Sequence, residues 1–539
     1  MEHLDSRKKT TIMIAVIAAM LFAALNQTIV STALPRIIER LGGMEYYSWV
    51  FTVYMLTSSI TTILVGKLSD IYGRKPFILT GIGLFLVGSF LCGTSHDIVQ
   101  LIMYRGIQGL GGGMIMSTAF SAVGDLFSPR ERGRWTGIMS GAFGLSSLFG
   151  PTLGGYIVDH TEWHWVFWVF LPFGFIAFFM ILFMFPKTER KTGETVDYLG
   201  SLFLTLTMVP MLLAFSWAGS KYDWGSGTIL LLFGGAMVAL ILFIFTELKV
   251  KSPVLPMHLF RNSIFTVSNL AGFLLGAGMF GAIMYMPWFI QGVMGTSASL
   301  SGFITMPMML SMVVASAVCG QLTTKTGKYK GFALFGTLTM GAGMYLLSFM
   351  STDTTTFTVI INMIITGLGL GMAMPVFTLT VQNAVDTKML GVATSSSQLF
   401  RTLGGTIGVS VMSTILSHTL ISKMTADKNA ADGLQVIPAA DATLLKELND
   451  PQILLDPGKL EQMRSRLSEG GQPMFDQLVM FMREALSGAL SSVFLTGAVI
   501  LIAGFILTWF IKAIPLRTSQ KRPASTEPDE SGPKRLAHE

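Results

Sequence analysis

The sequence is poor in charged residues. Of its 539 residues, 13% are charged and 51% are hydrophobic, whereas a soluble domain carries about 25% charged residues. With a mean hydropathy of +0.60, too little polar surface remains to cover a soluble fold. The shortage of charge therefore predicts long apolar segments in a membrane, and a net charge of +6 is too modest to argue for a nucleic-acid partner.

Cysteines and enzyme motifs are also scarce. Cys92 and Cys319 both lie inside apolar runs, where a cysteine behaves as a small buried hydrophobic residue, and a disulfide framework or a zinc site needs more. The chain has no Gly-x-x-x-x-Gly-Lys-Ser/Thr loop to bind ATP, no Gly-x-Ser-x-Gly elbow and no His-Glu-x-x-His pair. We therefore expect no enzyme, no cofactor, no metal and no use of ATP, so that any uphill transport draws on an ion gradient.

What the chain does have is apolar runs of membrane-spanning length, about 20 residues each. Basic residues precede the first run and no small-residue cleavage site follows it, which favours an uncleaved helix over a signal peptide. The predicted spans are 12–34, 46–66, 77–95, 98–122, 134–158, 164–185, 198–217, 227–247, 264–289, 300–322, 331–350, 356–380, 391–417 and 487–512. The polar stretch 418–486 is expected to be an external loop or cap, and the tail 513–539 to be disordered.

Lysine and arginine predict the orientation of these fourteen spans. Short loops on the side of the N-terminus (residues 1–11) are rich in basic residues, whereas the short loops on the opposite side hold only Arg36, Arg40 and Lys221. The basic loops include Arg74 and Lys75, Arg130, Arg132 and Arg134, Lys187, Arg190 and Lys191, Lys249, Lys251 and Arg261, Lys325, Lys328 and Lys330, and Lys388. Both termini are therefore expected in the cytoplasm.

The chain contains an internal repeat. Residues 66–75 read GKLSDIYGRK and residues 320–328 read GQLTTKTGK; residues 109–113 read GLGGG and residues 367–371 read GLGLG. Repeated halves are typical of secondary transporters, whose site lies between the halves. The repeat predicts one six-helix bundle over 12–185 and a second over 264–417 and 487–512. An inserted helix pair, 198–247, separates the two bundles.

Several motifs resemble the major facilitator superfamily, and within it the fourteen-helix drug:proton antiporters. They lie in the loop Gly66–Lys75, in Leu101–Gly109, in Gly141–Gly155, in Leu25–Pro35 and in Trp163–Pro172. The chain departs from this branch at Asn26, where the branch carries Asp, and at His164, where Arg is usual. The resemblance implies an all-α membrane protein that exports small amphiphilic molecules in exchange for protons.

The loop motif is the expected conformational latch. Gly66 and Gly73 allow a tight turn, and Asp70 can cap a helix or pair with Arg74 or with the basic cluster 130–134. Such a contact would have to break when the two bundles rock. A capping aspartate in a solvated loop is the alternative.

Two arginines lie inside apolar spans. A charge at the depth of Arg105 or Arg401 costs at least about 2.5–3.5 kcal/mol on insertion scales, so it indicates function by default. Arg105 is a proton-coupling candidate, or a structural arginine bonded to its surroundings. Arg401 can bind an anionic group or the carbonyls of a neighbouring helix. Asn26, Gln27, Gln108 and Arg401 are the candidates for a substrate cavity.

Glycines in the fifth span form a further motif. Gly137, Gly141 and Gly144 lie on nearly one helix face and permit close helix packing. The resemblance implies an antiporter motif made by Gly141, Gly150, Pro151, Gly154 and Gly155. Tight packing without a role in transport is the alternative.

An antiporter needs a group that gains and loses a proton, and no carboxylate lies in the middle of a predicted span. The remaining candidates lie near span ends: Asp70 and Asp125 on the inner side, and Asp159 and Glu162 on the outer side, with His164 beside the outer pair. The leading hypothesis is proton-driven drug export across the cell membrane. Export of an endogenous lipid or amphiphile, or a receptor or scaffold that transports nothing, are the alternatives.

Overall fold

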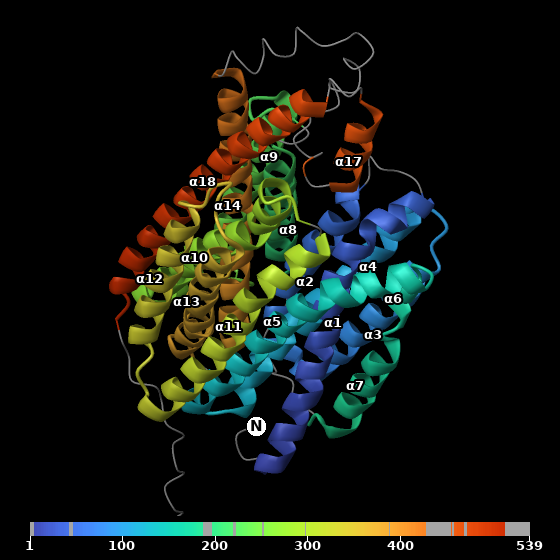
Figure 1. Ribbon diagram of the computed structural model, residues 1–539. Helices are drawn as coiled ribbons and strands as arrows, with labels where there is room; N and C mark the ends of the chain where they lie inside the picture. The colour runs from blue at the N-terminus through green and yellow to red at the C-terminus, as the bar shows by residue number, and fades with distance from the viewer. Residues whose placement is uncertain are drawn as a thin grey trace, which may run out of the picture.

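The computed structural model describes residues 5–41, 47–186, 197–218, 222–250, 253–296, 298–386, 389–426, 454, 457–467 and 472–512. Within these residues the chain is helical and forms no named strand, with one isolated bridge between Ala218 and Tyr222. The first half contains α1 (Ser6–Leu41), α2 (Tyr47–Tyr72), α3 (Arg74–Gly93), α4 (Ile98–Leu126), α5 (Pro129–His160), α6 (Trp165–Trp168) and α7 (Leu171–Met184). These helices pack side by side in one bundle (Figure 1).

The second half contains α10 (Ser263–Pro287), α11 (Ala298–Thr326), α12 (Lys330–Leu347), α13 (Thr356–Asn383), α14 (Leu390–Ala426), α17 (Pro457–Arg466) and α18 (Gln472–Trp509). A 3-10 turn, η2 (Met257–Arg261), precedes α10, and a π-helical segment, η3 (Trp288–Val293), follows it. α10, α12, α14 and α18 pack together, and α11 and α13 complete this bundle. α8 (Tyr198–Trp217) and α9 (Gly227–Lys249) form a hairpin between the two halves in sequence.

Ten helical segments of the described residues are long and apolar enough to cross a membrane. Large apolar side chains point outward from them, with Phe183 of α7 79% exposed and Leu231 of α9 78% exposed. Such a surface suits lipid rather than water, and a helix satisfies its backbone hydrogen bonds internally there. α2, α4, α5 and α12 also lie at predicted spans, but glycine and polar residues lower their apolarity.

The internal repeat is visible in how the helices pack. A side chain on Gly111 of α4 would clash with the backbone of Phe85 in α3, and one on Gly369 of α13 would clash with the backbone of Met340 in α12. Gly73 and Gly327, the equivalent turn glycines of the two repeated loops, both have positive φ, at 91° and 70°. Only glycine adopts this conformation readily. The same helix pairs therefore approach through the same glycines in both halves.

The helices that border the predicted external segment 418–486 are longer than expected. α14 continues to Ala426 and α18 begins at Gln472, so both pass beyond the predicted span ends. Apolar residues of α17 join the core of the second half together with Phe475 of α18. Figure 1 shows α17 at the opposite end of the molecule from the N-terminus. Part of the segment therefore belongs to the helical bundle, because helix periodicity continues where hydropathy falls.

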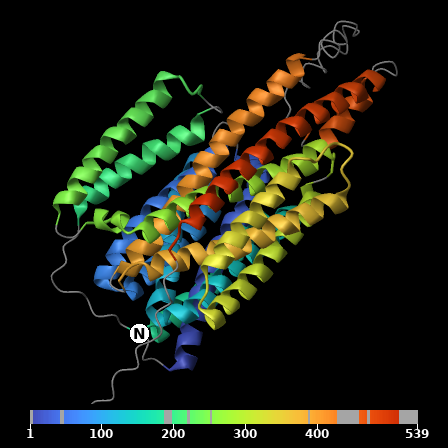
Figure 2. The ribbon, with the colours of Figure 1, turned by 90° about the vertical axis from the view of Figure 1, so that its left-hand side faces the viewer.

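The α8–α9 hairpin runs along one edge of the two bundles (Figure 2). Trp224 at its tip donates a hydrogen bond from Nε1 to Oγ1 of Thr414 in α14 at 2.8 Å. The rings of Trp217 in α8 and Trp49 in α2 pack edge to face, with centroids 5.6 Å apart. The hairpin thus contacts helices of both halves, through α2 and α14.

Candidate functional site

The latch residues lie where α2 ends and α3 begins. Gly73 makes the turn, and Arg74, the first residue of α3, pairs with Asp70 through Nη2 and donates from Nε to Oδ2 of Asp125 in α4 at 2.8 Å. Both Asp70 and Arg74 are buried. The pair therefore joins the ends of three helices of the first half.

Asp70 also reaches the second half. Its Oδ1 accepts a hydrogen bond from the backbone N–H of Gly391 at 3.2 Å, and its Oδ2 accepts one from Val392 at 3.1 Å. These are free N–H groups in the first turn of α14, where the helix dipole favours a negative charge. Asp70 thus contacts both a helix N-terminus and Arg74. The side chain of Arg132 donates to the carbonyl oxygens of Gly124 and Phe127.

Close packing surrounds this contact. A side chain on Gly66 would meet the carbonyl oxygen of Gly391 at 3.1 Å and the Cβ of Ser395 at 2.7 Å. The hydroxyl of Ser395 in α14 lies 3.0 Å from that of Ser117 in α4. The latch end of the molecule is therefore closed, with α2 and α4 pressed against α14.

The α5 glycines line a second contact between the halves. A side chain on Gly137 would meet the carbonyl oxygen of Ser316 in α11 at 2.6 Å, and Gly141 and Gly144 face Val313 of the same helix. Further along, Gly150 and Gly154 face Thr28 and Ile29 of α1 instead. The expected one-sided stripe is confirmed, and the motif Gly141–Gly155 contacts α11 with one part and α1 with another. The side chain of Pro151 and the surroundings of Gly155 lie outside the described part of the chain.

Arg105 lies at the centre of a polar network inside the first bundle. Its side chain is fully buried, donates from Nη1 to Oε1 of Gln108 at 2.6 Å and lies 4.3 Å from the ring centre of Tyr54. Nε donates to the carbonyl oxygen of Val50 at 3.3 Å. Nη2 has no hydrogen-bond partner among the described atoms. Among the described residues, the charge is therefore balanced by a carbonyl, side-chain amides and an aromatic face.

Asn26 of α1 completes this network. Its Oδ1 accepts a hydrogen bond from Nε2 of Gln108 at 3.0 Å and one from Nη1 of Arg105 at 3.4 Å, and Nε2 of Gln108 also donates to Ser89 at 2.6 Å. Asn26 and Gln108 are fully buried in this conformation. Of the four cavity candidates, these two therefore lie inside the first bundle rather than on an open surface.

The other two cavity candidates are partly exposed. Gln27 donates from Nε2 to the sulfur of Met55 at 3.4 Å, and Arg401 donates from Nη2 to Oε1 of Gln398 one helical turn away. The backbone carbonyl of Arg401 packs closely against Gly276 of α10. Each of these side chains has more N–H donors than this one hydrogen bond uses.

The outer candidates for proton coupling are not buried together. Glu162 is exposed, and His164 is partly buried with its ring stacked on Trp163, the ring centres being 4.0 Å apart. The backbone of Asp159 is in the last turn of α5, and its side chain lies outside the described residues.

Two buried acids were not singled out from the sequence. Among the described residues, the buried carboxylates are Asp70, Asp197 and Glu247. Asp197 precedes α8 and Glu247 lies near the end of α9. An acid directly before an apolar run and an acid two residues before a lysine both resemble ordinary helix ends, so only their positions at the two ends of one predicted hairpin could have indicated that they lie close together.

Two repeated helical bundles that meet through a charged latch, with a buried arginine network in one of them, define a multi-pass membrane transporter rather than an enzyme. Residues 16–409 match the Major Facilitator Superfamily, and the chain belongs to that superfamily. It is 37% identical to the "Multidrug transporter protein MdtP" of Bacillus subtilis (strain 168), over 98% of this chain and 97% of the relative. It is 31% identical to the "Multidrug resistance protein 3" of the same organism, over 94% of this chain and 96% of the relative.

Solved structures show the same fold at low sequence identity. The human organic anion transporter MFSD10 (TETRAN) superimposes with a TM-score of 0.61 at 15% identity, covering 93% of this chain and 99% of that one. The proton:xylose symporter XylE superimposes with a TM-score of 0.58 at 13% identity, covering 94% of this chain and 97% of that one. The predicted all-helical major facilitator fold is confirmed.

Proposed function

We propose that this chain exports small amphiphilic molecules, drugs among them, from the cell in exchange for protons by alternating access. Its fourteen predicted spans place both termini and the latch on the cytoplasmic side. The names of the two Bacillus relatives support a drug substrate, and the fungal relative "Efflux pump roqT" of Penicillium rubens, 30% identical over 80% of this chain, supports export.

The proposed mechanism rests on one contact between the two halves. Asp70 in the first half binds the first turn of α14 in the second half, on the side where the basic residues gather. For a central site to open toward the cytoplasm, α2 and α14 must separate there, and these hydrogen bonds must break. The conformation described has this side closed, so it corresponds to the stage that faces outward or is occluded.

The coupled proton needs a group that titrates during this cycle. Asp70 is buried in the latch, whereas Glu162 and His164 stand at the outer end with Asp159. Arg105 is a coupling candidate because its positive charge favours the ionised form of any acid that comes close to it. We retain these five residues as the coupling candidates, and the substrate is expected to meet Gln27 and Arg401 between the halves.

The experiment is a growth-inhibition panel in a bacterial host that lacks its own pumps, expressing the wild-type chain, with efflux measured before and after a protonophore. We expect resistance to several amphiphilic antimicrobials, and efflux that stops when the proton gradient is dissipated. Asp159→Asn and Glu162→Gln should each reduce efflux. Efflux that survives loss of the gradient would contradict proton exchange, whereas no resistance to any compound would contradict drug export.

A further inference from the structure

Tyr54 of α2 lies beside the charge of Arg105 in α4. The Cζ atom of Arg105 is 4.3 Å from the centre of the Tyr54 ring, inside the roughly 6 Å at which an aromatic face attracts a guanidinium group. Tyr54 is 3% exposed and Arg105 is fully buried, so water does not weaken this attraction. The contact therefore joins α2 to α4 at a place that neither helix exposes to solvent.

Glycines of α4 allow the ring to come this close. A Cβ atom on Gly109 would be 2.6 Å from the carbonyl oxygen of Tyr54, and one on Gly112 would be 2.6 Å from its hydroxyl oxygen. Both distances are shorter than the contacts that a real Cβ atom makes. A side chain at either position would therefore displace α2 or the ring.

The same glycine contact recurs in the second half. Gly367 of α13 packs on the carbonyl oxygen of Met308 in α11, as Gly109 packs on that of Tyr54. The alignment of the two repeated loops also matches Tyr54 with Met308. The two side chains therefore occupy equivalent places, and close packing on a glycine does not by itself require a tyrosine.

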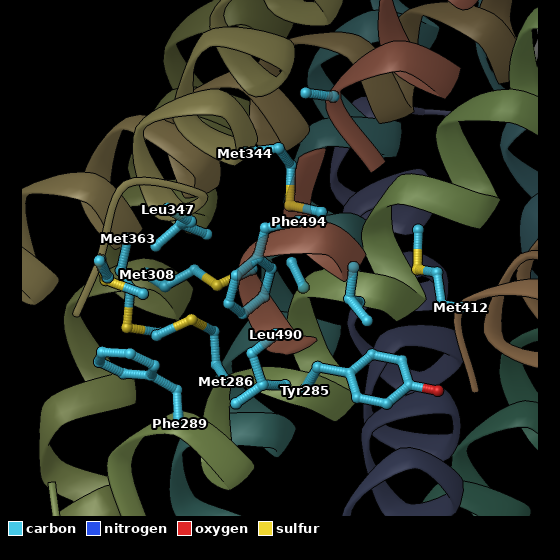
Figure 3. Packing of buried hydrophobic residues seen from close by; sticks show 14 of the residues in the cluster. Tyr285, Met286, Phe289, Met308, Met344, Leu347, Met363, Met412, Leu490 and Phe494 are labelled. Atoms are coloured by element: carbon cyan, nitrogen blue, oxygen red, sulfur yellow. The ribbon is translucent and has the colours of Figure 1, made fainter. Parts of the chain in front are cut away.

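Methionine replaces both members of the pair in the second half. The glycine motifs of α4 and α13 align Arg105 with Met363. Figure 3 shows Met308 and Met363 in the apolar core of that half. The aromatic ring is thus present where the helix partner is a buried cation and absent where the partner is methionine.

The ring restrains Arg105 in a direction that its hydrogen bonds do not. A guanidinium group is planar and its N–H bonds lie in that plane. Nη1 donates to Gln108 and Asn26, and Nε donates to the carbonyl oxygen of Val50. An aromatic face attracts the group from outside the plane. It occupies none of the N–H donors, and Nη2 has no hydrogen-bond partner among the described atoms.

We propose that Tyr54 is a positioning residue for Arg105, which holds the guanidinium group in place without neutralising it. A carboxylate would also hold the arginine, but its negative charge would cancel the positive one. The ring carries no net charge, so the arginine keeps its own for an acid or a substrate that comes close during transport. This inference rests on the proposed role of Arg105 in coupling.

The contact itself is tested without any substrate, in the purified full-length chain. Melting temperatures are compared for the wild type, Tyr54→Leu, Arg105→Met and the double variant. Tyr54→Leu removes the ring and keeps an apolar side chain. We expect the double variant to lose clearly less than the sum of the two single losses, because the ring has no cation to hold once the arginine is gone. Additive losses would overturn the proposal.

The effect on transport is measured as efflux of calcein acetoxymethyl ester, a neutral amphiphile, from cells that carry equal amounts of each variant. Tyr54→Phe keeps the ring face and should retain efflux within about twofold, whereas Tyr54→Leu should lose about tenfold or more. Met308→Leu is the matched control at the equivalent position of the second half, and it should stay near wild type. Equal losses in Tyr54→Phe and Tyr54→Leu, or normal efflux in Tyr54→Leu, would overturn the proposal.

Failure of the proposed function gives a different result. Absence of efflux from the wild-type chain would contradict drug export, and efflux that is indifferent to a protonophore would contradict proton exchange. In both cases the melting temperatures still decide whether the ring holds the arginine.

Discussion

The two halves share one arrangement of helices but fill their centres differently. Gly109 in α4 and Gly367 in α13 are repeat partners, and the same offset of 258 residues pairs Arg105 with Met363. Arg105 lies in a fully buried polar network with Asn26 and Gln108. Met363 lies in an apolar core of methionine, leucine and phenylalanine side chains (Figure 3).

The centres of the two halves therefore differ in how rigidly they are packed. The network of the first half is held by directional hydrogen bonds, so it keeps one geometry. In Figure 3, Met286, Met308, Met344 and Met363 surround Phe494 in the second half. Unbranched thioethers repack at little cost around different shapes. The first half therefore holds a polar network of fixed geometry at its centre, and the second half holds an apolar core that repacks more readily.

The largest effect is expected from substitution of Arg105, the charged residue of the repeat pair. Arg105→Ala takes away the donor to the buried Oε1 of Gln108, at a cost of about 1–3 kcal/mol, and we expect efflux to be lost. Arg105→Lys should not restore it, because an ammonium group lacks the planar fork of the guanidinium. The readouts are efflux, membrane level and melting temperature.

Met363→Leu at the partner position is the matched control. A swap of similar volume should cost less than about 1.5 kcal/mol and leave efflux near wild type. Loss of efflux in Met363→Leu, or normal efflux in a stable Arg105→Ala, would contradict the division between the halves.

The repeated loops give a second, smaller contrast. The partner of Asp70 in the second loop is Thr324, whose hydroxyl donates to the carbonyl of Gly320 within its own helix. Asp70→Asn takes the charge out of hydrogen bonds worth about 1.5–3 kcal/mol, so efflux should fall by about tenfold or more at an unchanged membrane level.

Thr324→Ala should leave efflux within about twofold, since this change removes a neutral hydroxyl and no charge. The measurement is efflux from cells that carry equal amounts of each variant. Equal losses in the two variants would show that the latch is symmetric, against the one-sided contact of Asp70 with α14.

A third variant changes the charge of the first half without removing a contact. Asn26 faces Arg105 at 3.4 Å, so Asn26→Asp would place a negative charge beside the arginine. With no such charge, the wild-type chain should export neutral or monoanionic drugs better than dications, because like charges repel strongly where water is scarce. Asn26→Asp should shift the preference toward dications by a few fold.

The measurement is a paired resistance test with one monoanionic and one dicationic antimicrobial. Strong wild-type resistance to the dication alone would refute the expectation. Dication resistance that appears only in Asn26→Asp would support it.

The sequence was most informative where a short motif has one geometry. Gly73 and Arg74 indicated the latch turn, and glycine spacing indicated both the repeat and the α5 stripe. The sequence was least informative about how each helix is rotated about its axis and how the helices pack against one another. Hydropathy placed Asn26 and Gln108 in spans but could not show that both turn into the first bundle. Asp197 and Glu247 were missed because their proximity depends on how the α8–α9 hairpin packs, and no local pattern encodes that.

The helix ends also show what hydropathy measures. Hydropathy identifies the apolar segment that crosses the hydrocarbon of the bilayer, which is about 30 Å thick. It does not show where the helix itself ends. α14 has 37 residues and α18 has 38, so each is about 55 Å long at 1.5 Å per residue. Their polar ends were therefore assigned to the loop.

These long helices have a mechanical consequence. Because α14 and α18 continue past the predicted spans and α17 packs into the same core, the cap that these segments form is fixed to the second half. When that half tilts, the cap moves through a wider arc than any residue within the membrane, because it lies at the far end of the long helices. A small rotation between the two halves therefore moves the cap through a large distance.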